Sequence, residues 1–409
     1  MQLANSTFHL TYCTNIHPAD VWDETFEQLR RYAPALKARL APDAPFGIGL
    51  RLSSRESEEL LEGDRLDQFR AFLDENGLYI AIINGFPFGS FHKRVIKENV
   101  FAPDWCEEER VNYTLRLIQI LKHLLPAGLD GGISTLPLSY NRWIEDGDDA
   151  VWEVMTRNIV RVAEAMYKVR QRTGQFIHLD IEPEPDGLTE NSDELIAFYR
   201  DRLLPVGAPL LAESLGIPVA EARDALREHI QVCFDTCHFA VEYEDAATAL
   251  ASFATAGIKV GRVQISSALR VPLPDDTGLR TALARHLEPF AESTYLHQVI
   301  ERRAAGELHH YSDLAHALPM IHEPLAKEWR IHFHVPLFVE EFGTFGSTQG
   351  DIRTVFGLLH EAPFTTHLEI ETYTWDVLPA HLKLDLLESI HREFRWVLEA
   401  LTHAQGGNL

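Results

Sequence analysis

Polar and apolar side chains alternate along several short segments that are rich in β-forming residues. In one segment the polar set is His178, Asp180, Glu182 and Glu184, and the residues between them are Ile177, Leu179 and Ile181. Successive side chains of a strand point to opposite faces, so this spacing places the polar groups on one face. The other segments with this alternation carry the polar sets His9 and Thr11; Cys233 and Asp235; Arg262, Gln264 and Ser266; His332 and His334; and Glu369 and Glu371. Six such segments predict a polar site lined by strands.

Three of these polar residues, Glu182, Asp235 and Glu371, are carboxylates on separate segments. In a partly buried pocket they cannot all stay ionised without a positive counter-charge. A divalent cation is the simplest counter-charge. An oxygen-rich set completed by a glutamine or a histidine suits Mn²⁺, Mg²⁺ or Zn²⁺ without choosing among them. The alternative is a set of separate ion pairs with arginine or lysine.

Two histidine motifs accompany these carboxylates. Asp235 and His238 form a D-x-x-H run at a predicted strand end, which suits a metal ligand followed by a group that contacts substrate. Capping of the next helix by His238 is the alternative. His332 and His334 are two residues apart, so both imidazoles face one way on a strand. We interpret His334 as a base or as a hydrogen-bond donor to substrate, and a second metal held by the pair is the alternative.

Nine β-rich segments alternate with amphipathic segments of helical length. The β-rich segments are 8–16, 46–52, 79–85, 132–138, 176–182, 231–238, 262–268, 330–338 and 367–375. Strand–helix alternation predicts parallel strands joined by right-handed crossovers, and eight such units close a barrel. A barrel, unlike an open doubly wound sheet, gives the polar faces a common interior. We therefore expect an α/β fold, a (β/α)8 TIM barrel, in one domain over residues 1–409.

Nine candidate strands are one more than the barrel needs, so one of them is expected to lie outside it. The stretch 271–329 is much longer than the usual connection between barrel elements. We expect an insertion there, in the late part of the barrel. Reactive residues of TIM barrels lie at the C-terminal ends of strands, which favours Glu182, Asp235, Gln264, His334 and Glu371.

The composition bounds the class of protein. The chain has 409 residues, 45% of them hydrophobic, and its 37 basic and 61 acidic side chains give a net charge of −24. Such apolar content supports a large buried core, and the negative charge disfavours nucleic acids and anionic membrane surfaces as partners. Four cysteines are too few for a disulfide framework, and residues 1–20 show no signal-peptide pattern. We expect a cytoplasmic enzyme of undetermined oligomeric state.

Several sequence runs resemble the xylose isomerase-like TIM barrels, a superfamily of sugar isomerases, epimerases and related enzymes. These runs are HLDIEPEP at 178–185, CFDTCHFA at 233–240, RVQISSAL at 262–269 and LEIETYTW at 368–375. Two further runs, HFHVPLF at 332–338 and ETYTWDVLP at 371–379, resemble the EboE-type metabolite-traffic proteins. The resemblance extends over most of the chain and is weakest in 270–330.

The resemblance implies one divalent metal ion, with the ligands Glu182, Asp235, Gln264 and Glu371. It also implies that Glu182 and Glu371 exchange protons with the substrate and that His238 contacts it. The implied function is a metal-dependent isomerase or epimerase of a small polyhydroxylated carbonyl compound of the sugar or cyclitol type. The alternative is a metabolite-binding or trafficking protein of the EboE type with little or no turnover.

The chain departs from the superfamily pattern at the third ligand. Gln264 stands where the superfamily more commonly has histidine, which shifts the metal preference away from zinc. The strand predicted around His334 has no counterpart in a minimal barrel. If that strand replaced 262–268 in the barrel wall, His334 would be the third ligand and Gln264 would leave the site.

Overall fold

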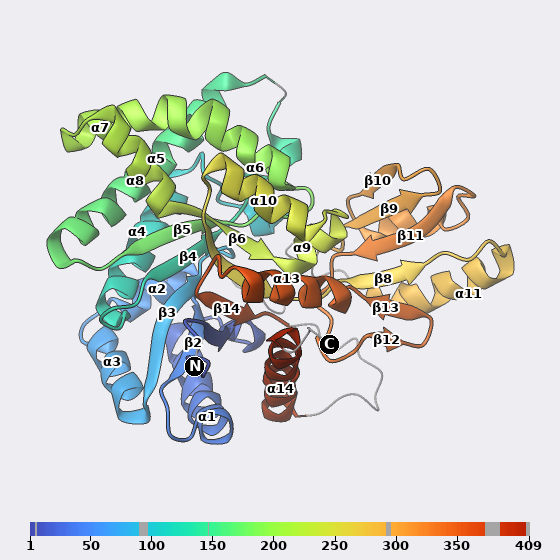
Figure 1. Ribbon diagram of the computed structural model, residues 1–409, viewed down its shortest axis with the longest axis horizontal. Helices are drawn as coiled ribbons and strands as arrows, with labels where there is room; N and C mark the ends of the chain where they lie inside the picture. The colour runs from blue at the N-terminus through green and yellow to red at the C-terminus, as the bar shows by residue number, and fades with distance from the viewer. Residues whose placement is uncertain (5, 90–96, 146, 292–295, 373–384, 406–409) are drawn as a thin grey trace.

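Eight parallel strands form a nearly closed barrel (Figure 1). The computed structural model describes residues 1–4, 6–89, 97–145, 147–291, 296–372 and 385–405. The strand order is β1-β14-β7-β6-β5-β4-β3-β2, and a bridge between Cys13 and Gly49 links the two edges. The strands are β1 (His9–Tyr12), β2 (Phe46–Arg51), β3 (Leu78–Asn84), β4 (Gly131–Thr135), β5 (Ile177–Ile181), β6 (Ile230–Asp235), β7 (Val260–Ile265) and β14 (His367–Ile370). The predicted (β/α)8 fold is confirmed.

Helices surround the barrel and cover the apolar faces of its strands (Figure 1). Ile177, Leu179 and Ile181 of β5, for example, are fully buried in one apolar core with residues of the outer helices. These helices are α1 (Trp22–Leu40), α2 (Ser54–Leu60), α3 (Arg65–Asn76), α4 (Glu108–Leu124), α5 (Asp149–Thr173), α6 (Ser192–Phe198), α7 (Ala208–Leu215), α8 (Val219–His229), α9 (Thr236–Val241), α10 (Ala246–Ala256), α13 (Gln349–Glu361) and α14 (Leu386–Gln405). The outward faces of the strands therefore bury apolar side chains, which leaves the inner faces to the polar ones.

None of the helices in the described part of the chain is, by itself, long and apolar enough to cross a membrane. One pair of neighbouring segments, Ser192–Leu215 and Val219–His229, is long and apolar enough only when the two are taken together. The chain bends by 109° between them.

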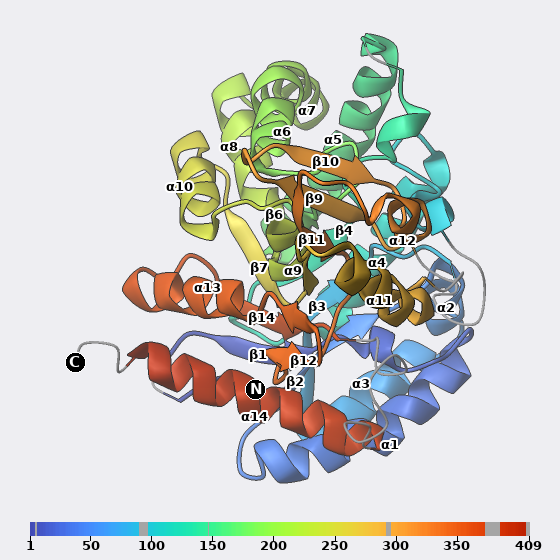
Figure 2. The same ribbon diagram turned by 90° about the vertical axis from the view of Figure 1, so that its right-hand side faces the viewer.

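A second, antiparallel sheet, formed by the chain between β7 and α13, projects from the barrel in Figure 1 and lies in front of it in Figure 2. Its strand order is β10-β9-β11-β8-β13-β12, and helices α11 (Thr277–Leu287) and α12 (Leu314–Ala317) accompany it. The strands are β8 (Leu269–Pro272), β9 (Val299–Arg303), β10 (Leu308–Tyr311), β11 (Ala326–Ile331), β12 (Glu341–Phe342) and β13 (Phe345–Ser347). This sheet has its own apolar core around Trp329. It extends beyond the range 271–329 that we expected for the insertion.

The surplus strand candidate is 330–338. Its first two residues end β11 in the second sheet, and 332–338 form no regular strand. The expectation that His332 and His334 lie on an inner barrel face is therefore wrong. The alternation has another cause, because Phe333 and Val335 are buried in the core of the second sheet while His332 and His334, which alternate with them, line the cavity at the barrel end. β7 keeps its place between β6 and β14, so no strand around His334 replaces it.

Candidate functional site

The C-terminal ends of the barrel strands surround a small cavity of about 70 Å³. Its lining includes four of the predicted site residues, which are Glu182, His238, His334 and Glu371. Asp235, at the end of β6, contacts both histidines, and Gln264 of β7 contacts Glu371. All six predicted residues therefore come together, although His334 arrives from the chain that leaves the second sheet rather than from a barrel strand.

The carboxylate of Glu371 is held by three side-chain amides. Asn15 and Asn84 donate to Oε1 over 2.7 and 3.1 Å, and Gln264 donates to Oε2 over 2.5 Å. These amides come from three positions around the barrel, so the orientation of the carboxylate is fixed. Sequence reasoning missed Asn15 and Asn84. Asn84 ends β3 and Asn15 follows β1, so the position of each beside a strand end was the available signal.

Asp235 has one oxygen that is fully used and one that has no hydrogen-bond donor. Oδ1 accepts from the backbone N–H groups of Cys237 (2.8 Å) and His238 (3.2 Å), which caps α9, and from the hydroxyl of Ser266. Oδ2 is buried without a hydrogen bond, and so is Oε2 of Glu182. Buried charged oxygens that lack donors are costly unless a cation lies beside them.

His238 and His334 present ring nitrogens to this oxygen. Nδ1 of His238 lies 3.1 Å from the carbonyl oxygen of Pro183, and Nδ1 of His334 lies 3.0 Å from that of Glu371. Each Nδ1 must donate there, because a carbonyl oxygen only accepts, and a neutral ring then carries its lone pair on Nε2. These Nε2 atoms lie 3.9 and 4.0 Å from Asp235 Oδ2. Metal-bound histidines have the same arrangement, with Nδ1 donating to an oxygen and Nε2 facing the ion.

The electrostatics of the cavity follow from burial and from crowding of like charges. Burial, reinforced by Asp235, raises the pKa of Glu182 well above its usual range, and burial with Glu182 does the same to the pKa of Glu371. Burial lowers the pKa of His238 to about 4. Burial also opposes ionisation of Asp235, but His238 and His334 outweigh it and lower the pKa of that carboxyl. Without a cation, ionisation of the two glutamates is therefore opposed, and the imidazole of His238 is neutral at pH 7.

Both polar atoms of the Gln264 side chain are engaged in hydrogen bonds. Its amide nitrogen donates to Glu371, and its amide oxygen accepts from the thiol of Cys233. Above this level His332 packs edge-on against His238, with ring centroids 4.6 Å apart, and Nδ1 of His332 is hydrogen-bonded to the side chain of Gln298 over 2.9 Å. The second sheet thus contributes a further polar layer over the barrel end.

Glu393 of α14 supports both segments that flank the cavity. Its buried carboxyl accepts from the backbone N–H of Leu337 (3.1 Å) and from the hydroxyl of Thr372 (3.3 Å). Thr372 follows Glu371 directly, and Leu337 lies three residues after His334. Burial raises the pKa of Glu393 to about 8.

The raised pKa of Glu393 predicts a pH-dependent stability. The folded chain binds more protons than the unfolded chain between pH 4.5 and 8, so the free energy of unfolding falls as pH rises through that window. The slope reaches about 1.4 kcal/mol per pH unit. Glu393→Gln removes this contribution, and we expect it to match the wild type at pH 5 and to be the more stable protein at pH 8.5 in urea titrations.

Glu388→Gln is the matched control, because this carboxylate lies on the same helix but is 44% exposed. It should leave the difference between the two pH values as in the wild type. Equal pH slopes for the wild type and Glu393→Gln would contradict the prediction.

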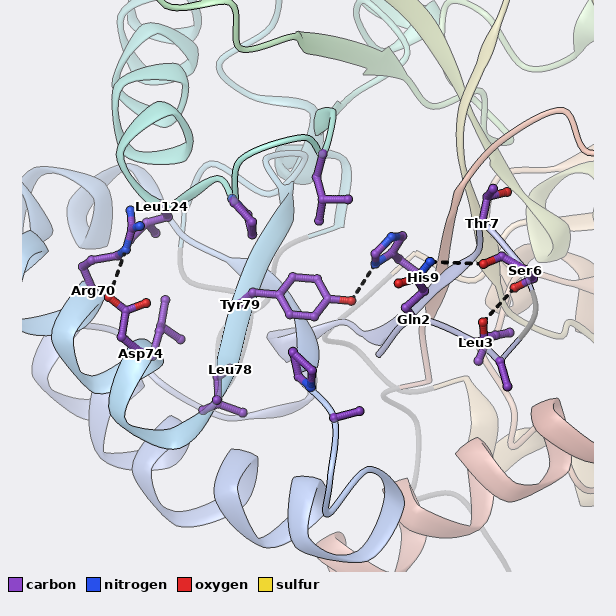
Figure 3. A pocket seen from close by; sticks show the side chains of 17 residues that line it. Gln2, Leu3, Ser6, Thr7, His9, Arg70, Asp74, Leu78, Tyr79 and Leu124 are labelled. Atoms are coloured by element: carbon purple, nitrogen blue, oxygen red, sulfur yellow. Dashed lines mark hydrogen bonds and ion pairs between the residues drawn. The ribbon is translucent and has the colours of Figure 1, made fainter.

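A larger cavity, of about 1020 Å³, lies at the opposite end of the barrel (Figure 3). It is lined near the N-terminal ends of the strands, where Tyr79 and His9 point toward one another and share a hydrogen bond of 2.7 Å. Asp74 is its only carboxylate among the lining residues that the structure describes. The candidate site is therefore identified by the carboxylates and imidazoles at the other end of the barrel and not by the volume of the cavity.

Comparison with known proteins supports the fold. No protein-family model matches the chain, and no curated protein sequence matches it. Among solved structures, a xylose isomerase-like TIM barrel protein from Mycobacterium smegmatis in complex with magnesium has 14% identity and a TM-score of 0.50, over 98% of both chains. D-allulose 3-epimerase from Methylomonas sp. in complex with D-allulose has 10% identity and a TM-score of 0.48, over 96% of this chain and 97% of that one.

The IOLI protein with a bound zinc atom has 11% identity and a TM-score of 0.45, over 97% of this chain and 99% of that one. Identities this low bear on the fold alone. The likeness to the Mycobacterium smegmatis protein extends over nearly the whole of both chains, and this chain has the fold of the xylose isomerase-like TIM barrels.

Proposed function

We propose that the protein is a divalent-metal-dependent isomerase or epimerase of a small polyhydroxylated carbonyl compound, of the sugar or cyclitol type. One observation carries the proposal. Glu182, Asp235 and Glu371 converge at the C-terminal end of the barrel, and two of them present buried oxygens that no donor satisfies. TIM-barrel enzymes perform their chemistry at this end.

The proposed ion is held by Glu182, Asp235 and Glu371, with Gln264 or His334 as the fourth ligand. His334 is favoured because its Nε2 already faces Asp235, whereas the amide oxygen of Gln264 is engaged by a thiol. Oxygen ligands with one imidazole or amide suit Mn²⁺, Mg²⁺ or Zn²⁺. When bound, such an ion polarises the carbonyl and hydroxyl oxygens of a substrate and acidifies the C–H bond between them.

The side chains of the cavity supply the proton transfers in this mechanism. Glu182 removes the proton from the substrate carbon, and Glu371 returns one, or His334 does so where Gln264 is the fourth metal ligand. Glu371 is oriented for this by its three amide donors, and β5 and β14 stand apart in the barrel, with β6 and β7 between them. His238 is neutral with its Nδ1 occupied, so its Nε2 can accept a hydrogen bond from a substrate hydroxyl.

Exchange of substrate hydrogen with solvent tests the proposal. The chelator-treated full chain is incubated in D₂O with a panel of ketoses, aldoses and inososes and with Mn²⁺, Mg²⁺ or Zn²⁺ in turn. We expect metal-dependent deuterium incorporation at the carbon next to the carbonyl in at least one compound. Tight binding of a panel compound without exchange or product would contradict the proposed catalytic activity. It would favour the alternative, a metabolite-binding protein of the EboE type.

Ser266 provides a test of the metal site that needs no substrate. Its hydroxyl donates to Asp235 and accepts from the backbone N–H of Cys237 over 2.9 Å, so it orients the carboxylate. Loss of such a supporting hydrogen bond typically lowers metal affinity about 10- to 100-fold. We expect Ser266→Ala to weaken Mn²⁺ binding by that factor in calorimetric titrations.

Ser267→Ala is the control, since Ser267 is equally buried but its hydroxyl lies beside Thr348 rather than beside a carboxylate. Its Mn²⁺ affinity should equal that of the wild type. Unchanged affinity in Ser266→Ala would exclude Asp235 as a ligand oriented by this serine.

A further inference from the structure

A second cluster of metal-ligating side chains lies inside the barrel at the end opposite to the candidate active site. It consists of Asp130, immediately before β4, His178 in β5 and His367 at the start of β14. One potential ligand atom from each lies within 4.8 Å of the others. Oδ1 of Asp130 is 3.2 Å from Nε2 of His367, and Oδ2 is 3.7 Å from Nε2 of His178. Two imidazoles and one carboxylate are a common ligand set for a transition-metal ion.

His178 is oriented as a metal-bound histidine would be. Its Nδ1 lies 2.5 Å from Oδ1 of Asp180, which accepts the N–H, so a neutral ring carries its lone pair on Nε2. That Nε2 is completely buried and lies 3.7 Å from Oδ2 of Asp130, which is longer than a normal hydrogen bond. A carboxylate that fixes the ring from behind is the arrangement found around protein-bound zinc.

Two glycines leave the space that this pair of side chains needs. A Cβ atom on Gly132 of β4 would lie 2.7 Å from both His178 and Asp180. A Cβ on Gly261 of β7 would lie 1.9 Å from Oδ1 of Asp180 and 2.8 Å from Nδ1 of His178. Any other residue at Gly132 or Gly261 would displace the side chains of His178 and Asp180, so both positions require glycine.

The charges also favour a cation. Arg262 lies 3.0 Å from Asp180 and 3.2 Å from Glu369, so one positive side chain serves two buried carboxylates. With Asp130, this end of the barrel interior holds three carboxyl groups and one guanidinium, so a further positive charge is favoured there.

We propose that Asp130, His178 and His367 bind a divalent transition-metal ion, of which Zn²⁺ is the best match, at the N-terminal end of the barrel. Asp130 is 38% exposed and borders a surface cavity of about 830 Å³, which gives the ion an entry path and leaves a coordination position for water. The ion would join β4, β5 and β14, and β14 is adjacent to neither of the other two. Residues at this end of a TIM barrel contribute to stability rather than to turnover, so the ion stabilises the fold by linking these strands across the barrel interior.

Zinc stoichiometry tests this proposal independently of the proposed function. The full chain is stripped with a chelator and reloaded with Zn²⁺ alone, and bound metal is counted. We expect Asp130→Asn and His367→Gln each to hold one zinc ion fewer than the wild type. His9→Gln is the matched control, since His9 is a buried histidine at the same barrel end whose Nδ1 is bonded to Tyr79, and it should keep the wild-type count.

Glu182→Gln separates the two sites, because it should lose zinc from the C-terminal end only. Chelator-treated Glu182→Gln should therefore still gain thermal stability on addition of Zn²⁺, and Glu182→Gln/Asp130→Asn should gain none. Zinc-edge anomalous scattering should show a peak between the Asp130 carboxylate and the two imidazoles. Equal zinc counts in the wild type, Asp130→Asn and His367→Gln, or no anomalous peak there, would show that a proton on His178 takes the place of the ion.

Discussion

Glu182→Gln is expected to lower the rate of substrate deuterium exchange by roughly 10²- to 10⁴-fold, the usual contribution of a general acid–base group. The amide cannot accept the proton that the proposed mechanism assigns to this side chain. It also carries no charge, so it is a poorer ligand for the proposed ion. Because glutamine has nearly the same shape as glutamic acid, and burial disfavours the charged form of this glutamate, the variant should fold as the wild type does.

Glu242→Gln is the matched control for this substitution. Burial raises the pKa of Glu242 well above its usual range too, but the residue lies at the end of α9 and does not line the candidate site. It should exchange deuterium at the wild-type rate. Glu371→Gln should lose exchange as Glu182→Gln does. Exchange that persists in both Glu182→Gln and Glu371→Gln would exclude proton transfer by these carboxylates.

The barrel was predictable because strand–helix alternation and face-by-face polarity are local properties of the sequence. The segment 330–338 shows the limit of that reasoning. Phe333 and Val335 face the core of one sheet while His334 faces the end of another, and this produces the same alternation as a barrel strand. Periodicity reports which sides of a segment are apolar, but not which sheet the apolar side packs against.

The predicted site residues come together because five of the six lie at or near the ends of barrel strands, or in the helix α9 that follows β6. What the sequence could not supply is how each side chain is used. Gln264 reaches the site as expected, but its amide orientation depends on Cys233 and Glu371, which come from neighbouring strands. Asn15 and Asn84 were missed because an asparagine beside a strand end is ordinary turn chemistry until a carboxylate is found opposite.

Arg262→Met is expected to lower the free energy of unfolding by about 3–5 kcal/mol, the usual cost of leaving buried charges without their partner. The guanidinium of Arg262 is completely buried and bonds Asp180, Glu369 and the carbonyl oxygen of Ile83. Methionine has a similar length and packs well, but it donates no hydrogen bond. Urea unfolding in the presence of a chelator, followed by circular dichroism, measures the loss without any contribution from bound metal.

Two comparisons identify charge as the cause of that loss. Arg39→Met breaks an ion pair of 2.8 Å with Glu388 whose members are 42% and 44% exposed, and it should cost less than about 1 kcal/mol. Arg262→Met/Asp180→Asn/Glu369→Gln removes the stranded carboxylates together with the arginine and should recover most of the lost stability. If the triple variant is no more stable than Arg262→Met, packing rather than charge accounts for the loss. The barrel interior would then need Arg262 for its shape and not as the counter-charge of Asp180 and Glu369.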